Sequence, residues 1–208
     1  MQFSTVRQIA EYAAGAYGDK DFCRFFANKE LHVKSYKQFY ENSLAVCRYI
    51  RSIEKNRIHI GFIGRTSYEY ISCLTGMIFS SNVVVPFAPD ISVEEATQLF
   101  DDADIEMLFC EEEFLQKAEK INENYGSIKK IISLGNREWF AEIFKNYSSE
   151  SDYAYLSDID EKPDECSLII YSSGTTGDRK GVMLSNRNLA ANSSYRVYSM
   201  DEDDVSLS

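Results

Sequence analysis

The sequence predicts an α/β fold with a mostly parallel sheet and helices on both of its faces. Segments rich in β-branched and aromatic residues alternate with helix-compatible segments, which is typical of parallel sheets built from strand–helix–strand units. The strands are apolar on both faces, as strands that helices cover on both sides must be. A chain of 208 residues is also long enough to bury one sizeable core without disulfides or metal ions to stabilise it.

The N-terminal region is expected to hold two helices and a pair of strands before the sheet begins. Thr5 and Gln8 fit a capping box for a helix that ends near Tyr17. The segment 22–33 reads as two short strands around a turn. Apolar residues at helical spacing then predict a long helix over residues 36–53.

Four strand–helix units follow, and they supply the parallel sheet. The apolar strands are expected over residues 58–63, 83–85, 105–110 and 130–134. The helices that follow them are expected over residues 68–80, 92–103, 112–124 and 139–144. Pro86 is expected to stop the second strand, because proline has no N–H to donate to a neighbouring strand. Ser92 and Glu95 form a second candidate capping box.

An acidic segment divides the chain into three parts. Residues 147–165 contain seven acidic residues and four serines without periodicity, which indicates a linker. We therefore predict an N-terminal α/β subdomain over residues 1–146 and the start of the next subdomain over residues 166–208. The chain stops at Ser208 in what reads as another strand, so we expect the remainder of the catalytic domain and a C-terminal domain to be absent from it.

Charge and composition exclude several classes of function. Thirty-three acidic residues against twenty-two basic ones give a net charge of -11, which repels nucleic acid and anionic lipid over the surface as a whole. Two histidines supply almost no material for a multi-histidine metal site or a Ser-His-Asp triad. We therefore expect no nucleic-acid partner and no metal site in this chain.

Cysteine usage and hydropathy indicate the compartment. The five cysteines form no C-x-x-C pair and mostly lie in apolar runs, so we expect them to be reduced and the protein to be cytoplasmic. No apolar stretch reaches the roughly 18 residues that span a bilayer. We therefore expect no transmembrane segment.

The chemistry is expected in a loop after the apolar strand at residues 168–171. The candidate phosphate-binding residues combine hydroxyl groups, glycines and a lysine: Ser172, Ser173, Gly174, Thr175, Thr176, Gly177 and Lys180. Glycines allow backbone N–H groups to turn toward an anion, hydroxyls donate to its oxygens, and the lysine adds positive charge. A Walker loop is excluded, because its second glycine would fall on Arg179. The alternative is a solvent-exposed turn.

The segment 171–189, YSSGTTGDRKGVMLSNRNL, closely resembles the signature of the adenylate-forming superfamily, which includes acyl-CoA synthetases, firefly luciferase and peptide-synthetase adenylation domains. A weaker similarity covers residues 83–95. Two positions differ from the usual signature: Arg179 stands where the family usually has proline, and Asn186 where it usually has histidine. The resemblance implies the N-terminal portion of an acyl-CoA synthetase/luciferase-like large domain.

The resemblance also implies a reaction. A carboxylate attacks the α-phosphate of Mg-ATP to give an acyl-adenylate and pyrophosphate, and coenzyme A then takes the acyl group. ATP, Mg²⁺ and coenzyme A are thus implied, and the loop residues would hold the phosphates. The family's catalytic and metal-binding residues lie downstream, so we expect no catalytic residue in this chain and no ligase activity from the chain alone. Copies of it are expected to associate through the apolar face that the missing half would cover.

Three functions stay open at this point. The leading one is an AMP-forming acyl-CoA synthetase, or fatty acid–CoA ligase, with a long-chain fatty acid as the favoured carboxylate because residues 181–189 look most like that branch. The second is an amino-acid-activating adenylation domain. The third, from another class, is a non-catalytic ATP-binding or interaction module that keeps the loop.

Overall fold

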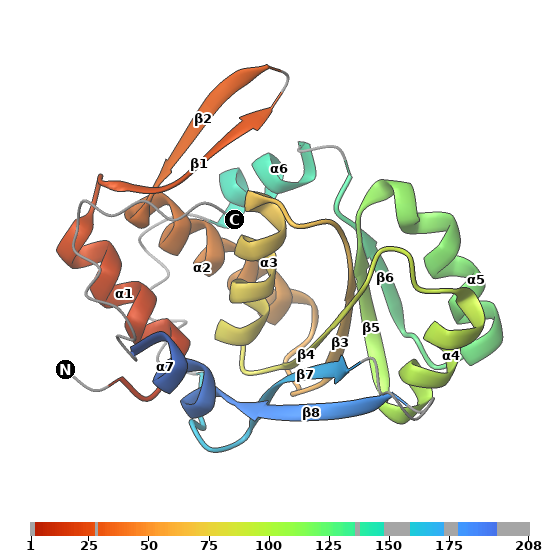
Figure 1. The fold of residues 1–208 in the computed structure, drawn as a ribbon. Coiled ribbons are helices and arrows are strands. Elements are labelled where there is room, and N and C mark those ends of the chain that lie inside the picture. The colour runs from red at the N-terminus through yellow and green to blue at the C-terminus, as the bar shows by residue number, and fades with distance from the viewer. Residues whose placement is uncertain (1–2, 28, 136–137, 148–158, 173–178, 195–208) are drawn as a thin grey trace.

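The computed structural model is built around one six-stranded sheet (Figure 1). It describes residues 3–27, 29–135, 138–147, 159–172 and 179–194. The strands of the sheet are β3 (His59–Ile63), β4 (Val83–Phe87), β5 (Ile105–Cys110), β6 (Lys130–Ser133), β7 (Cys166–Ser172) and β8 (Lys180–Ser185). Their order is β6-β5-β3-β4-β7-β8, and every neighbouring pair is parallel except β7 with β8. The predicted fold class is confirmed.

Helices cover both faces of this sheet (Figure 1). One face carries α2 (Tyr36–Ile53), α3 (Tyr68–Phe79) and α6 (Glu138–Tyr147), and the other carries α4 (Val93–Asp102) and α5 (Leu115–Tyr125). Val83 and Val85 pack in the core beneath α4 and α5, whereas Val84 packs in the core beneath α2 and α3. β4 is thus buried on both faces, as predicted. None of the helices in the described part of the chain is long and apolar enough to cross a membrane.

The N-terminal elements pack beside the sheet and do not join it. Helix α1 (Val6–Tyr17) lies against α2 and α3 around a third core cluster that includes Ala10 and Phe79. β1 (Asp21–Ala27) and β2 (Glu30–Ser35) form a separate antiparallel hairpin. The helix and the two strands predicted for this region are confirmed.

The two predicted capping boxes are each present in one half only. Thr5 Oγ1 accepts the N–H of Gln8 at 3.3 Å, and Ser92 Oγ accepts the N–H of Glu95 at 3.1 Å, so both residues cap their helices. The second half of each box, in which the Gln or Glu side chain accepts the N–H of the capping residue, is replaced by another contact. Gln8 Oε1 accepts from the N–H of Ser4 at 2.9 Å, and the Glu95 carboxylate forms an ion pair with Arg179. The helix starts are therefore correct, while the reciprocal contacts go elsewhere.

Two element boundaries differ from the expectation. β4 continues through Pro86 to Phe87, so the prediction that proline stops this strand was wrong. β4 pairs with β3 through Pro86 and Phe87, which lie opposite Phe62 and Ile63, so the proline is accommodated within that ladder. The helix expected over residues 112–124 begins as a 3₁₀ turn, Glu112–Phe114, before α5 continues it.

The C-terminal part of the sheet contains a strand that the sequence did not indicate. β8 pairs antiparallel with β7 and leads directly into α7 (Asn186–Ser194). Apolar and polar side chains do not alternate clearly along its six residues, and Gly181 has no side chain. Most of the six residues are exposed in the structure. β7 and β8 belong to the same sheet as β3 to β6. The division of the chain into subdomains at residues 147–165 stays a prediction.

Gly76 allows α2 and α3 to approach each other closely. A Cβ atom at this position would lie 2.6 Å from Ser43 O and 2.6 Å from Val46 Cβ, both in α2. A Cβ atom does not approach other heavy atoms this closely, so any larger residue would push the helices apart. This contact sets how tightly the two helices cover the central strands.

Candidate functional site

The predicted phosphate-binding loop connects β7 to β8. Ser172 is the last residue of β7, Lys180 is the first residue of β8, and the two are cross-strand partners. Both are exposed. The other predicted site residues, Ser173, Gly174, Thr175, Thr176 and Gly177, lie outside the described residues. The structure thus brings the two described members of the predicted site together at one end of a strand pair.

β7 ends at the edge of the sheet where ligands bind in many α/β folds. β7 runs parallel to β4, with Leu168 opposite Val84, so the carboxyl ends of these strands lie at the same edge. In open α/β sheets, ligands bind beyond the carboxyl ends of the strands. A loop that follows Ser172 therefore begins at the expected position for a ligand-binding loop.

Helix α4 contacts the chain on both sides of the loop. The Tyr171 hydroxyl donates to Asp102 Oδ2 at 2.6 Å, which ties the end of β7 to the end of α4. Arg179 forms an ion pair with the Glu95 carboxylate in the first turn of α4. Burial and the Asp102 carboxylate raise the pKa of Tyr171 above its usual range, so its hydroxyl stays protonated and donates at neutral pH. One helix therefore positions both ends of the loop.

Two residues that follow the loop, Arg179 and Gly181, make structural contacts. Arg179 occupies the position where the signature usually has proline, and its ion pair with Glu95 supplies a restraint in place of the proline ring. Gly181 is closely packed, because a Cβ atom there would lie 3.0 Å from Ile169 Cγ2 and 3.3 Å from the Tyr171 ring, and these side chains would have to shift to accept it. Both residues thus support the strands that carry the loop.

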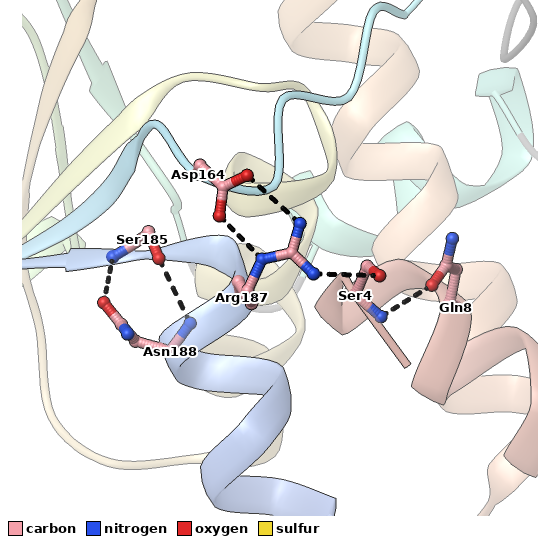
Figure 2. Close-up of polar contacts among 6 residues, drawn as sticks. All are labelled: Ser4, Gln8, Asp164, Ser185, Arg187 and Asn188. Carbon is pink, nitrogen blue, oxygen red and sulfur yellow. Dashed lines mark hydrogen bonds and ion pairs between the residues drawn. The ribbon is translucent and has the colours of Figure 1, made fainter. Parts of the chain in front are cut away.

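Arg187 connects the start of α7 with two distant segments (Figure 2). Its guanidinium donates to the two carboxylate oxygens of Asp164 at 2.6 and 3.1 Å and to Ser4 Oγ at 3.4 Å. Ser185 and Asn188 close the first turn of α7 reciprocally, since the N–H of each donates to the side-chain oxygen of the other at 3.0 and 3.2 Å. The end of the signature segment is therefore held by polar contacts within the protein.

Asn186, the first residue of α7, is buried and makes a further polar contact. Its Oδ1 accepts the N–H of Val6, the first residue of α1, at 2.8 Å, and this N–H has no partner within its own helix. Glu161, at the end of the acidic segment, accepts from the Thr5 hydroxyl at 2.9 Å and pairs with Arg7 at 2.6 Å. Asn186 stands where the signature usually has histidine, and in this chain it caps α1. Sequence reasoning missed this role because Val6 and Asn186 are 180 positions apart.

Other reactive side chains in the described part of the chain have structural explanations. Burial raises the pKa of Cys47 and of Cys110 to about 12, so these thiols stay protonated. His59 Nδ1 lies 2.6 Å from Ala103 O and is satisfied by that contact. Among the described residues, no group of three or more histidine, cysteine, aspartate or glutamate side chains is arranged to hold a metal ion.

A cavity of about 300 Å³ lies beyond the carboxyl ends of β3, β5 and β6. Its lining includes Glu69, Trp139, Phe140 and the three consecutive glutamates 111–113. Burial raises the pKa of Glu111 above its usual value. Because a lining with four carboxylates repels a triphosphate, the loop between β7 and β8 is the better candidate for binding a nucleotide.

These features define a class of protein. A mostly parallel sheet covered by helices on both faces, with a segment rich in hydroxyl groups and glycines after one strand, is an α/β domain of the kind in which ligands bind beyond the carboxyl ends of the strands. Comparison with known families makes the assignment specific, because the family described as AMP-binding enzyme matches residues 10–208. The chain belongs to this family.

Curated relatives are longer than this chain. The long-chain-fatty-acid–CoA ligase ACSBG2 of Xenopus laevis is 27% identical over 198 residues, which make up 89% of this chain and 26% of the relative. The malonate–CoA ligase of Arabidopsis thaliana is 28% identical over 134 residues, which make up 62% of this chain and 21% of that relative. The chain spans about a quarter of the length of the curated relatives it matches.

Solved structures of similar proteins share the fold. A long-chain-fatty-acid-CoA ligase (FadD1) from Archaeoglobus fulgidus matches 90% of this chain and 38% of its own length, with a TM-score of 0.73 at 19% identity. The N-terminal domain of FACL13 from Mycobacterium tuberculosis matches 88% of this chain and 45% of its own length, with a TM-score of 0.71 at 15% identity. At these identities the likeness is one of fold.

Proposed function

We propose that this chain forms the N-terminal part of an AMP-forming acyl-CoA synthetase. In the proposed reaction a carboxylate attacks the α-phosphate of ATP, pyrophosphate leaves, and an acyl-adenylate forms. The thiol of coenzyme A then takes the acyl group and AMP leaves. The observation that supports this proposal most is the signature loop between Ser172 and Lys180 in a chain of the AMP-binding enzyme family.

The loop is proposed to bind the β- and γ-phosphates of ATP. The hydroxyls of Ser172, Ser173, Thr175 and Thr176 would donate to phosphate oxygens, and Lys180 would offset their charge. Gly174 and Gly177 would let the backbone approach. A carboxylate is ionised at neutral pH and needs no general base, so positioning and charge neutralisation are the main tasks of the protein.

The remaining requirements are proposals for the longer protein. No cluster of three or more histidine, cysteine, aspartate or glutamate side chains among the described residues is arranged to hold a metal ion, and the ligands for Mg²⁺ are proposed to come from the rest of the longer protein. Coenzyme A is the proposed acyl acceptor. The cytoplasmic location and the association of copies of this chain stay predictions.

The proposed carboxylate is a long-chain fatty acid. This choice is supported by several relatives, which are named as long-chain-fatty-acid–CoA ligases. Another relative is named for malonate, so similar proteins differ in the acid they are named for. The substrate therefore has to be tested separately from the adenylation step.

Carboxylate-dependent exchange between ATP and pyrophosphate tests the proposal in the full-length protein. Exchange is expected with palmitate and weaker with acetate, malonate, benzoate or amino acids, and it is not expected from the 208-residue chain alone. Thr175→Ala with Thr176→Ala is expected to lower the exchange rate on the order of 100-fold, since donors to the phosphates are removed. Lys37→Ala, at an exposed position of α2, is the matched control and is expected to change nothing.

Each outcome separates one part of the proposal from the rest. Exchange with an acid other than a long-chain one would refute the substrate and leave adenylation standing. Exchange with amino acids alone would favour an amino-acid-activating enzyme. ATP binding without exchange on any acid would refute the synthetase proposal.

A further inference from the structure

The hairpin of β1 and β2 presents an apolar surface to solvent. Phe26 is 77% exposed, Leu31 55% and Val33 43%. Phe26 is the cross-strand partner of Leu31, and Val33 is the partner of Arg24. Residues directly opposite each other, or two apart along one strand, point to the same face of a hairpin. The three apolar side chains therefore form one surface, called here the outer face of the hairpin.

The base and the inner face of the hairpin anchor it to the protein. Phe22 stacks on Phe39 of α2 with ring centroids 4.2 Å apart, and Phe25 stacks on Tyr68 of α3 at 5.9 Å. Lys34 Nζ lies 5.4 Å from the centroid of the Tyr68 ring. Figure 1 shows the hairpin standing away from the main sheet. Because the inner face is already packed, the outer face is held toward solvent.

The charge of the hairpin is opposite in sign to that of the chain. Residues 21–35, which form the hairpin, contain three basic and two acidic residues, whereas the whole chain has a net charge of -11. Lys29 lies in the turn between Phe26 and Leu31. Arg24 lies on the outer face with 57% of its side chain exposed, and it also pairs with Asp21. Exposed apolar side chains thus lie beside cations in an otherwise acidic protein.

This combination matches the chemistry of an anionic bilayer surface. Apolar side chains enter the boundary between headgroups and acyl chains, while neighbouring lysine and arginine side chains remain at the level of the phosphates. A second protein copy fits less well, because three side chains offer far less than the about 800 Å² per partner that a stable interface buries. Bilayer contact needs only a few apolar groups together with electrostatic attraction.

We propose that the outer face of the hairpin docks reversibly on anionic lipid bilayers. The acidic remainder of the surface is repelled by such a bilayer, so the hairpin is the contact that orients the protein on it. The proposal does not depend on ligase activity. A lipid-like carboxylate substrate would nevertheless reach the protein most readily at a bilayer.

Sedimentation with vesicles tests the docking. The 208-residue chain is expected to pellet with vesicles of equal parts phosphatidylcholine and phosphatidylserine and to stay in solution with phosphatidylcholine alone. Phe26→Ser with Leu31→Ser is expected to lower binding at least about tenfold. Lys29→Glu and added salt are expected to weaken it as well. Val182→Ser with Met183→Ser, which changes the exposed apolar pair of β8, is the matched control and is expected to leave binding unchanged.

A reporter on the outer face distinguishes insertion from electrostatic attraction. Phe26→Trp is expected to be quenched by vesicles that carry brominated acyl chains, above the constant contribution of the half-buried Trp139. Circular dichroism is expected to match the unmodified chain for every variant, since the changed side chains are exposed. Absence of pelleting, absence of quenching, or an equal loss of binding in the β8 control would overturn the proposal. A lipid-free dimer that Phe26→Ser with Leu31→Ser dissociates would overturn it in favour of a second copy.

Discussion

The central strands β3 and β5 and the edge strand β8 belong to one sheet, yet different interactions hold them in place. Phe62 and Phe109 in the centre are fully buried, whereas Val182 and Met183 of β8 are 50% and 66% exposed. Burial of apolar surface stabilises the centre. The edge is positioned by polar contacts of its flanking residues with α4, α1 and the acidic segment. The comparison teaches that the scaffold of the loop depends on a few specific partners, while the core depends on summed burial.

The largest expected effect tests the core. Phe109→Ala is expected to lower the free energy of unfolding by about 3–5 kcal/mol, because it leaves a cavity in a fully buried layer against Trp139. Met183→Ala at the edge is expected to change it by less than about 0.5 kcal/mol. Urea unfolding followed by circular dichroism measures both. Similar losses at the two positions would show that the centre and the edge are not held differently.

The second prediction concerns the contact between α2 and α3. Gly76→Ala is expected to lower the free energy of unfolding by about 1–3 kcal/mol, since its Cβ atom would collide with Ser43 and Val46. Gly15→Ala in α1 is the control: a Cβ atom there meets nothing within 4 Å, so better helix propensity is expected to raise stability by about 0.5–1 kcal/mol. Thermal unfolding of the two variants checks the opposite signs. A neutral Gly76→Ala would mean that the helices can separate without loss.

The third prediction concerns the hydrogen bond between Asn186, at the start of α7, and Val6, at the start of α1. Asn186→Ala removes the acceptor of the Val6 N–H and is expected to lower stability by about 1–2 kcal/mol. Asn186→Asp keeps an acceptor at the start of α1, where negative charge is favourable, and is expected to restore most of the loss. Amide hydrogen exchange of the first turn of α1 measures the effect locally. Unchanged protection in Asn186→Ala would remove this contact from the account of the edge.

The smallest expected effect concerns α4 and the loop. Tyr171→Phe removes the hydroxyl that donates to Asp102 and is expected to change stability by about 1 kcal/mol or less. Glu95→Gln removes the ion pair with Arg179 and is expected to raise the Kd for ATP of the full-length protein by up to about fivefold. Exchanging the charges, Glu95→Arg with Arg179→Glu, is expected to recover part of the affinity. Unchanged ATP affinity in Tyr171→Phe and in Glu95→Gln would mean that α4 does not position the loop.

The central elements were predictable because their signals are local. The runs at residues 58–63 and 105–110 are apolar throughout and are followed by helices, so their burial is already present in the order of residues. β8 was missed because it takes its conformation from pairing with β7 and not from a pattern of its own. Pro86 was misjudged because the cost of a proline in a strand depends on which neighbour needs its N–H, and that depends on the register with the neighbouring strands.

The sequence by itself determined the α/β class and the position of the loop from Ser172 to Lys180, because strand burial, glycines and hydroxyls are properties of short segments. Only the tertiary structure decided which residues hold that loop and its flanks. The contacts of Arg179 with Glu95 and of Asn186 with Val6 join residues far apart in the chain. Such contacts depend on how the layers pack, and no pattern within one segment reports them.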